Sequence, residues 1–230
     1  MTASSTPRTV TAVTVDVWVR RVADVPEGRD LLDDHERATL ARIVPPATAR
    51  SYAAGHALAR RAVASRVGST ATSLRFDRTC TRCGAPHGRP VLLGFPGVEL
   101  SLSRCDDWVA VALSALPLGI DIESTEAVRF PGFPAVALHP DERDVVPSGD
   151  GLLRRHAVSW VRREAALKAH GIGLRTDPAG LRTPPSGLSS ELLGDGDATV
   201  TVHDLALPWP EATAAVAVAG QVGQVDVRLR

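Results

Sequence analysis

The sequence predicts an α+β fold built from two similar halves with antiparallel strands. Strand-like segments follow one another at short intervals, which leaves no room for the crossover connections that parallel strands need. The order of elements is strand, helices and strands, followed by a helix and further strands. This order roughly repeats itself and suggests a pseudo-duplicated chain, although the residues themselves carry no visible repeat.

The first half is expected to cover residues 10–114, after a short disordered tail at residues 1–9. Alternating valines predict a strand over residues 10–20. Helices are predicted over residues 31–43, where acidic side chains stand near the start, and over residues 47–67, which end at Gly68. A turn region rich in Cys, Gly and Pro follows at residues 80–90, and strands are predicted over residues 99–103 and 108–114.

The second half is expected to cover residues 115–230. It opens on a predicted strand at residues 118–123 and continues through a proline-rich, irregular connector. A helix starting at His139 and Pro140 is expected to break at residues 147–151, and a stronger helix is predicted over residues 152–170. Residues 175–197 are predicted to form a loop, and strands over residues 198–203 and 212–219 complete the core.

Composition excludes several classes of protein. The formal net charge is zero, so no global field attracts the chain to nucleic acid or to an anionic membrane. No apolar run approaches the ~20 residues needed to span a bilayer, and residues 1–9 lack the apolar stretch of a signal peptide. Three cysteines do not suggest a disulfide framework. We therefore expect a cytoplasmic monomer that binds neither nucleic acid nor membrane.

Lys168 is the only lysine among 26 basic residues. An ammonium group is a compact point charge that can release a proton, whereas a guanidinium group is a planar fork that stays charged. A lysine retained in such an arginine-rich chain is therefore a candidate functional residue. The alternative is an ordinary surface ion pair with Glu164, four residues earlier on the same helix.

Three carboxylates accompany this lysine. Asp121 and Glu123 alternate with isoleucines on a predicted strand, so both side chains point to one face. Glu164 continues the apolar stripe of the helix over residues 152–170, where an unpaired charge would be costly. Carboxylates gathered on one face suit a hard divalent cation. The alternative is a half-exposed strand whose acids point into water.

These residues resemble the signatures of the 4′-phosphopantetheinyl transferases. The family's Gly-x-Asp-x-Glu strand corresponds to Gly119, Asp121 and Glu123, and its Trp-x-x-Lys-Glu-Ala-x-x-Lys helix corresponds to Trp160, Arg163, Glu164, Ala165 and Lys168. The order and separation of the two motifs also suit the family. The resemblance covers roughly residues 31–174.

The resemblance implies transfer of 4′-phosphopantetheine from coenzyme A to a serine of an acyl or peptidyl carrier protein, at an active site between the two halves. It implies Mg²⁺ on Asp121, Glu123 and Glu164. Glu164 is then the candidate general base, directly or through water, and Lys168 is expected at the pyrophosphate, where it would stabilise the leaving 3′,5′-ADP.

The same resemblance implies basic contacts to coenzyme A. Arg89 stands in the family's Gly-Lys-Pro turn, Arg50 is expected to contact a phosphate, and Arg42 is a further candidate. Ser103 and Arg104 stand where the family usually has Ser-His. Arg104 is expected to bind the phosphate on the ribose as a bidentate donor, but unlike histidine it cannot become neutral. Taken alone, each of these arginines is more often solvated surface, and the family resemblance is what makes Arg50 and Arg89 candidates.

Two further readings of the sequence remain. Cys80, Cys83, His87 and Cys105 offer the donor types of a zinc site and would suit a small zinc-containing interaction domain. Unmodified thiols are the alternative. A non-catalytic nucleotide- or coenzyme-binding module would need the arginines but not the three carboxylates.

A hypothesis for carrier docking concerns residues 129–136. This proline- and glycine-rich segment holds Phe130 and Phe133 and follows the strand of Asp121. An exposed apolar loop often marks a partner surface. The alternative is that both phenylalanines plug the core.

Overall fold

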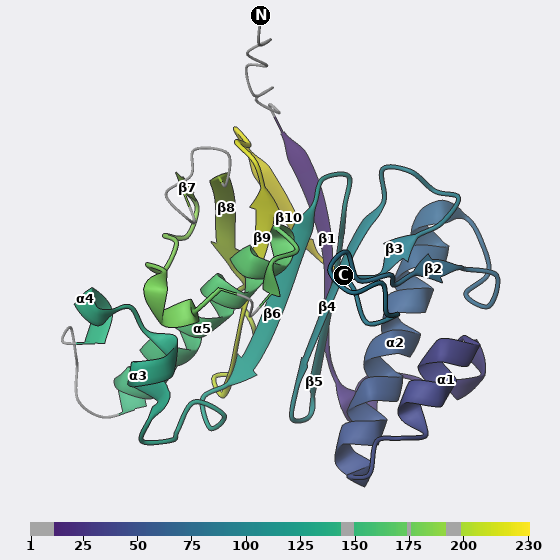
Figure 1. Ribbon diagram of the computed structural model, residues 1–230, viewed down its shortest axis with the longest axis horizontal. Helices are drawn as coiled ribbons and strands as arrows, with labels where there is room; N and C mark the ends of the chain where they lie inside the picture. The colour runs from purple at the N-terminus through teal and green to yellow at the C-terminus, as the bar shows by residue number, and fades with distance from the viewer. Residues whose placement is uncertain (1–11, 144–149, 174–175, 192–198) are drawn as a thin grey trace, which may run out of the picture.

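Two four-stranded sheets pack face to face, and each carries a long helix on its outer side in the computed structural model (Figure 1). The structure describes residues 12–143, 150–173, 176–191 and 199–230. The predicted tail at residues 1–9 and most of the predicted helix break at residues 147–151 lie outside these ranges. The fold is the predicted mixture of helices and largely antiparallel sheets.

The first sheet has the order β10-β1-β5-β4 and the second has the order β6-β9-β8-β7. The strands of the first sheet are β1 (Val13–Arg21), β4 (Glu99–Cys105), β5 (Trp108–Ser114) and β10 (Val225–Leu229). Those of the second are β6 (Leu118–Ser124), β7 (Ser189–Glu191), β8 (Thr199–Asp204) and β9 (Ala212–Ala219). A separate two-stranded ribbon consists of β2 (Phe76–Asp77) and β3 (Val91–Leu92).

The described helices are α1 (Asp34–Leu40), α2 (Pro46–Val67), α3 (Phe133–Ala137), α4 (Pro140–Arg143) and α5 (Asp150–Ala169). Short 3₁₀ turns occupy Val22–Asp24, Arg29–Leu31 and Pro178–Gly180. Helix α2 covers the outer face of the first sheet, and α5 covers the outer face of the second (Figure 1). Among the described residues, no helix combines the length and apolar character required to cross a bilayer.

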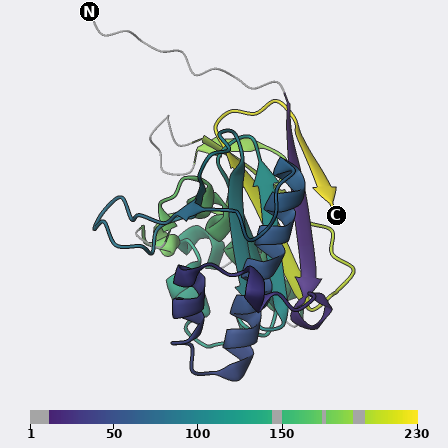
Figure 2. The same ribbon diagram turned by 90° about the vertical axis from the view of Figure 1, so that its right-hand side faces the viewer.

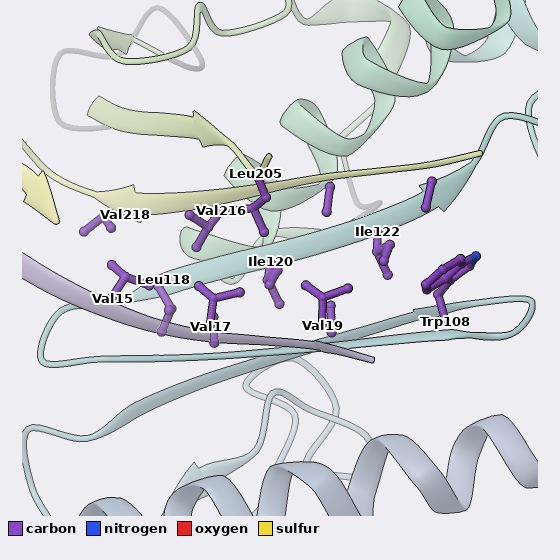
Figure 3. Close-up of a cluster of buried hydrophobic side chains, with 14 of the residues drawn as sticks. Val15, Val17, Val19, Trp108, Leu118, Ile120, Ile122, Leu205, Val216 and Val218 are labelled. Atoms are coloured by element: carbon purple, nitrogen blue, oxygen red, sulfur yellow. The ribbon is translucent and has the colours of Figure 1, made fainter. Parts of the chain in front are cut away.

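The inner core lies between the two sheets. Val15, Val17 and Val19 of β1 point across the interface toward Ile120 and Ile122 of β6 (Figure 3). All five side chains are at most 4% exposed, because alternate residues of each strand face the partner sheet. The remaining positions of β6 consequently face α5, and these include Asp121 and Glu123.

The sequence predicted the most regular elements well. Strands β5 and β9 have the predicted bounds, and α2 begins one residue before its predicted start and ends at Gly68, which adopts the left-handed conformation (φ 64°). Strand β4 runs two residues beyond its predicted end. Strands β1, β6 and β8 lie within a few residues of their predictions.

Other predictions need correction. The helix expected over residues 31–43 is only α1, because Asp33 caps it by accepting a hydrogen bond from Glu36 N and Leu31 belongs to a 3₁₀ turn. Strand β7 lies inside the segment predicted to be a loop. Strand β10 was not predicted, and it pairs with β1 in parallel, an exception to the antiparallel expectation (Figure 2).

The connector is also more ordered than expected. Residues 133–137 form helix α3, and the Phe133 side chain is only 3% exposed. Its ring packs against His156 and Trp160 of α5, with ring centroids 5.4 Å and 5.9 Å away. Phe133 is therefore a core residue, and the hypothesis that it forms part of an exposed carrier dock is wrong. Phe130 is 48% exposed.

Candidate active site

Strand β6 and helix α5 approach each other closely at Gly119. A Cβ atom at this position would lie 2.0 Å from Ala165 O and 2.6 Å from Ala169 N, so only glycine permits the contact. The close approach brings the last turns of α5 against the face of β6 that carries the carboxylates. One turn of α5 separates Glu164 from Lys168, so both side chains reach that face.

The Asp121 carboxylate is the centre of the site. Lys168 Nζ lies 2.6 Å from Asp121 Oδ1 and also donates hydrogen bonds to Ser103 Oγ and Ile120 O, each at 3.2 Å. Ser103 Oγ donates to the same Asp121 Oδ1 at 2.7 Å. Lys168 therefore joins α5 to the edges of both sheets. Asp121, Glu123, Glu164 and Lys168 are called the carboxylate cluster below.

Negative charge exceeds positive charge in the carboxylate cluster. Burial, together with the neighbouring Asp121 and Glu123 carboxylates, raises the pKa of Glu164 to about 7 against the lowering effect of Lys168. Burial likewise raises the pKa of Glu123 to about 6, with Asp121 adding to the effect. One ammonium group thus faces three carboxylates, and two of these bind their protons more tightly than usual.

Two carboxylate oxygens in the cluster have no hydrogen-bond partner. Asp121 Oδ2 and Glu164 Oε1 are both buried, and burying such an oxygen without a partner is costly. Oxygen ligands from carboxylates are those that Mg²⁺ prefers. The residues therefore fit a divalent cation chemically. Their oxygens do not form a set in which all lie within 4.8 Å of one another, so closure on a cation requires side-chain movement.

Cys105 belongs to this region and not to a four-ligand zinc site. Its Sγ donates a hydrogen bond to Glu123 Oε2 at 2.8 Å. Burial and the neighbouring Glu123 carboxylate raise the pKa of the thiol well above its ordinary value. Among the four residues weighed as an alternative zinc site, Cys105 is therefore engaged elsewhere, away from Cys80, Cys83 and His87.

A large open pocket of about 520 Å³ lies in the N-terminal half. Arg42 lines it, as do Tyr52 of α2 and Leu102 of β4. The remaining lining residues come from α1, α2 and the segment before β3: His35, Thr39, His56, Arg78, Pro86, His87, Gly88 and Pro90. The pocket is rich in groups that can be cationic, which suits an anionic ligand.

Adjacent residues of β4 connect this pocket to the carboxylate cluster. Because successive side chains point to opposite faces, Ser103 reaches Asp121 while Arg104 points to the side of α2. The Arg104 guanidinium lies 5.6 Å from the centroid of the Tyr52 ring, which lines the pocket. The structure thus brings Arg42 to the pocket and Arg104 to the Tyr52 ring in its wall, while Ser103 and Lys168 meet at Asp121.

The other two predicted basic contacts lie differently. Arg89 donates to Glu99 Oε2 at 2.7 Å, and its side chain is engaged in this ion pair. Arg50 is exposed and lines a separate hollow beside Gly28 and Arg29, away from the residues of the large pocket. The structure does not bring Arg50 together with Arg42.

Sequence reasoning missed a buried charged cluster beside the pocket. Arg60 is 1% exposed and donates to Glu36 Oε2 at 2.7 Å and to Asp33 Oδ2 at 2.6 Å. Arg78 donates to Glu36 Oε1 at 2.6 Å and lies 3.0 Å from Asp33 Oδ2. Burial opposes ionisation of Glu36, but hydrogen bonds from His56 and Arg60 lower its pKa to about 2. Asp33, Glu36, Arg60 and Arg78 are called the arginine-paired cluster.

Arg163 is a second buried arginine that the sequence did not reveal. It precedes Glu164 in α5, has no exposed side-chain surface, and donates to Leu181 O at 2.9 Å, to Ala137 O and to Glu142. It therefore anchors the helix that carries Glu164 and Lys168. A burial signal was present, since Ala166 and Leu167 lie three and four residues after Arg163 on the same face of the helix.

Comparison with known proteins finds one family model that matches part of the chain. Residues 117–219 match the family model of the 4′-phosphopantetheinyl transferase superfamily. Both motifs that carry the resemblance lie inside the matched segment, so the family interpretation is confirmed there. No protein of curated function matches the chain.

Proposed function

From this family match we propose that the protein transfers 4′-phosphopantetheine from coenzyme A to a serine of an apo acyl or peptidyl carrier protein. The carrier would belong to fatty-acid or secondary-metabolite synthesis. The observation that carries the proposal is the carboxylate cluster inside the matched segment, where three carboxylates face one lysine. The cluster has the excess negative charge that a Mg²⁺ site needs.

In this proposal Asp121, Glu123 and Glu164 hold Mg²⁺. The bound ion would neutralise charge on the pyrophosphate of coenzyme A and orient the phosphorus that reacts. The two unpartnered oxygens, Asp121 Oδ2 and Glu164 Oε1, support this assignment because a cation would satisfy both.

The reaction forms a bond between the serine oxygen and the phosphorus bound to pantetheine and breaks the bridging P–O bond. Glu164 accepts the serine proton, directly or through water. Lys168 stabilises the negative charge on the leaving 3′,5′-ADP, and its three hydrogen bonds hold the ammonium group in position.

The large pocket is proposed to bind the 3′-phosphate end of coenzyme A. Arg42 lines it, and Arg104 lies against its wall at Tyr52. The active site would then lie between two halves, residues 10–114 and 115–230, at the seam where β4 meets β6. A pseudo-duplicated origin of these halves remains part of the proposal, and it is supported by the similar placement of one long helix on the outer face of each sheet. Arg50 and Arg89 would contribute only if coenzyme A binding rearranges their present surroundings.

A non-catalytic coenzyme-binding module is the competing function. The carboxylate cluster argues against it, because three acids next to a bound pyrophosphate repel it unless a cation intervenes. Mass spectrometry of an apo carrier protein incubated with this protein, coenzyme A and Mg²⁺ separates the two. A mass gain of one phosphopantetheine group that disappears with EDTA and in Asp121→Asn supports the transferase. Coenzyme A binding without any mass gain on several carriers would favour the module.

A further inference from the structure

The loop between β2 and β3 gathers two thiols and an imidazole. Cys80, Cys83 and His87 offer one donor atom each, and these atoms all lie within 4.8 Å of one another. Cys83 Sγ lies 3.0 Å from His87 Nε2. Among the residues that the structure describes, no other trio of His, Cys, Asp or Glu side chains comes so close together.

The backbone of the loop is folded to present these side chains. Gly84 N donates to Cys80 O and Cys80 N donates to Ala85 O, both at 2.9 Å. Gly84 takes a left-handed conformation (φ 74°), which closes the turn directly after Cys83. Gly88 N donates to Arg78 O at 2.7 Å, so the segment that carries His87 returns beside the start of the loop. These backbone hydrogen bonds therefore place the Cys-x-x-Cys turn next to the histidine.

Apolar packing contributes little to this arrangement. Strands β2 and β3 contain two residues each, and a ribbon of that size is marginal by itself. The side chains of Cys83 and His87 are exposed, as are those of Thr81 and Arg82 between the cysteines. A loop with so few buried contacts needs another source of order to hold three donor atoms together.

We propose that Cys80, Cys83 and His87 bind one Zn²⁺ ion. Two thiolates and one neutral imidazole suit this borderline-soft cation, and the thiolates balance its charge after both thiol protons are released. Cys105 is not the fourth ligand, because its thiol on β4 donates to Glu123 on β6. The described residues offer no fourth protein ligand within the trio, so water completes the tetrahedron on the exposed side.

The proposed ion would brace one wall of the large pocket. His87 lines that pocket together with its neighbours Pro86 and Gly88. A metal that ties His87 to Cys80 and Cys83 would fix this segment relative to Arg78, which belongs to the arginine-paired cluster. The role is structural and does not depend on the proposed transfer reaction.

Metal binding is tested on the whole purified chain, kept reduced and stripped of metal with a chelator. We expect one equivalent of Zn²⁺ by elemental analysis after reloading. We also expect Co²⁺ to give the thiolate charge-transfer and intense visible bands of a tetrahedral site. In Cys83→Ser and His87→Ala, Co²⁺ affinity should fall by at least about 100-fold, since even second-shell losses cost about 10–100-fold.

Cys105→Ser is the matched control, since it removes a thiol outside the trio and should retain one equivalent. Both test variants alter exposed side chains, and circular dichroism verifies their fold. Absence of cobalt–thiolate bands in the reduced chain would overturn the site. Full stoichiometry in Cys83→Ser would do the same.

The bracing role has its own readout. Arg82 is exposed between the two cysteines and offers a trypsin site in the middle of the loop. Zn²⁺ should slow cleavage after Arg82 at least about tenfold in the native chain and leave the rate in Cys83→Ser unchanged, because local opening limits the cleavage of ordered loops. Equal cleavage rates with and without Zn²⁺ in the native chain would overturn the structural role.

Discussion

The arginine-paired cluster and the carboxylate cluster are both largely buried, yet their charges are balanced differently. In the first, two guanidinium groups face two carboxylates, and the pKa of Glu36 falls to about 2. In the second, one ammonium group faces three carboxylates, and the pKa of Glu164 rises to about 7. The two glutamates are almost equally buried, at 2% and 8% exposure. Burial alone therefore does not decide the direction of the shift.

The difference distinguishes an ion-paired structural cluster from a site prepared for a ligand. Every carboxylate oxygen of Glu36 is within hydrogen-bond distance of a partner, whereas Glu164 Oε1 and Asp121 Oδ2 have none. A buried charge that has all its partners is tolerated in the fold, and removing one partner is costly. An excess of carboxylates over cationic groups destabilises the fold unless a bound cation neutralises it. Matching substitutions in the two clusters should therefore have opposite effects on stability.

The largest effect is expected for Glu36→Gln. The change leaves buried Arg60 without one of its two carboxylate partners, so the free energy of unfolding should fall by about 3–5 kcal/mol, as when a buried pair is broken. Urea unfolding measures the loss. Glu126→Gln, which breaks an exposed ion pair with Arg129, serves as the control and should cost less than about 1 kcal/mol. A loss at Glu36 no greater than that of the control would contradict the role of the arginine-paired cluster.

The stabilisation that ionised Glu36 gives to the fold should depend on pH. The folded pKa of Glu36 lies below its ordinary value, so its stabilisation is present above pH 4.5 and is lost as the pH falls toward about 2. The gap in unfolding free energy between the native chain and Glu36→Gln should narrow across this window. Unfolding curves recorded at several pH values test this. If the difference in unfolding free energy stays constant down to about pH 2, the partners of Glu36 do not lower its pKa.

Lys168→Arg tests the one cation of the carboxylate cluster. A planar guanidinium cannot occupy the position of an ammonium that donates to Ser103, Ile120 and Asp121 together. Transfer should slow about 10²-fold, comparable to the loss of one preorganised donor in other enzymes. Arg162→Lys on the same helix, which alters a partly exposed pair with Asp204, should leave the rate near native. A Lys168→Arg enzyme of native rate would make the lone lysine incidental.

The smallest effect is expected for Glu164→Gln, and its sign is opposite to that of Glu36→Gln. The raised folded pKa means that stability declines as the pH rises from 4.5 through about 7, because the unfolded chain ionises first. In EDTA and above that pKa, the variant should therefore be more stable than the native chain by about 1 kcal/mol. Thermal unfolding provides the measurement. A loss of stability under these conditions would show that Glu164 already has its partners without a cation.

The sequence predicted those features of the carboxylate cluster that depend on the local spacing of residues along β6 and α5. Alternation on β6 correctly put Asp121 and Glu123 on one face, and helical spacing put Glu164 one turn from Lys168. The family motifs supplied the expectation that these segments meet. What joins them physically is Gly119, whose missing side chain admits α5, and this contact cannot be read from the spacing of charges.

The arginine-paired cluster escaped prediction for a related reason. The acids at residues 33–36 were interpreted as ordinary residues of a helix start, which is correct for Asp33. The partner of Glu36 is Arg60, 24 residues later, among several arginines of α2 that look alike in the sequence. Only packing against β2 and β4 distinguishes the buried arginine from the exposed ones. Strand β10 was missed likewise, because its short run of alternating valines finds its partner only in β1.

The parallel pairing of β1 with β10 has a consequence for how the chain reaches its fold. Residues 13–17 find their partners at residues 225–229, so β1 has an unpaired outer edge during most of synthesis on the ribosome. Contacts between residues so distant in sequence form slowly, since a long loop must close first. An uncovered strand edge is also a template for pairing with other chains. The nascent protein should therefore depend on chaperones and be prone to aggregation until β10 has emerged.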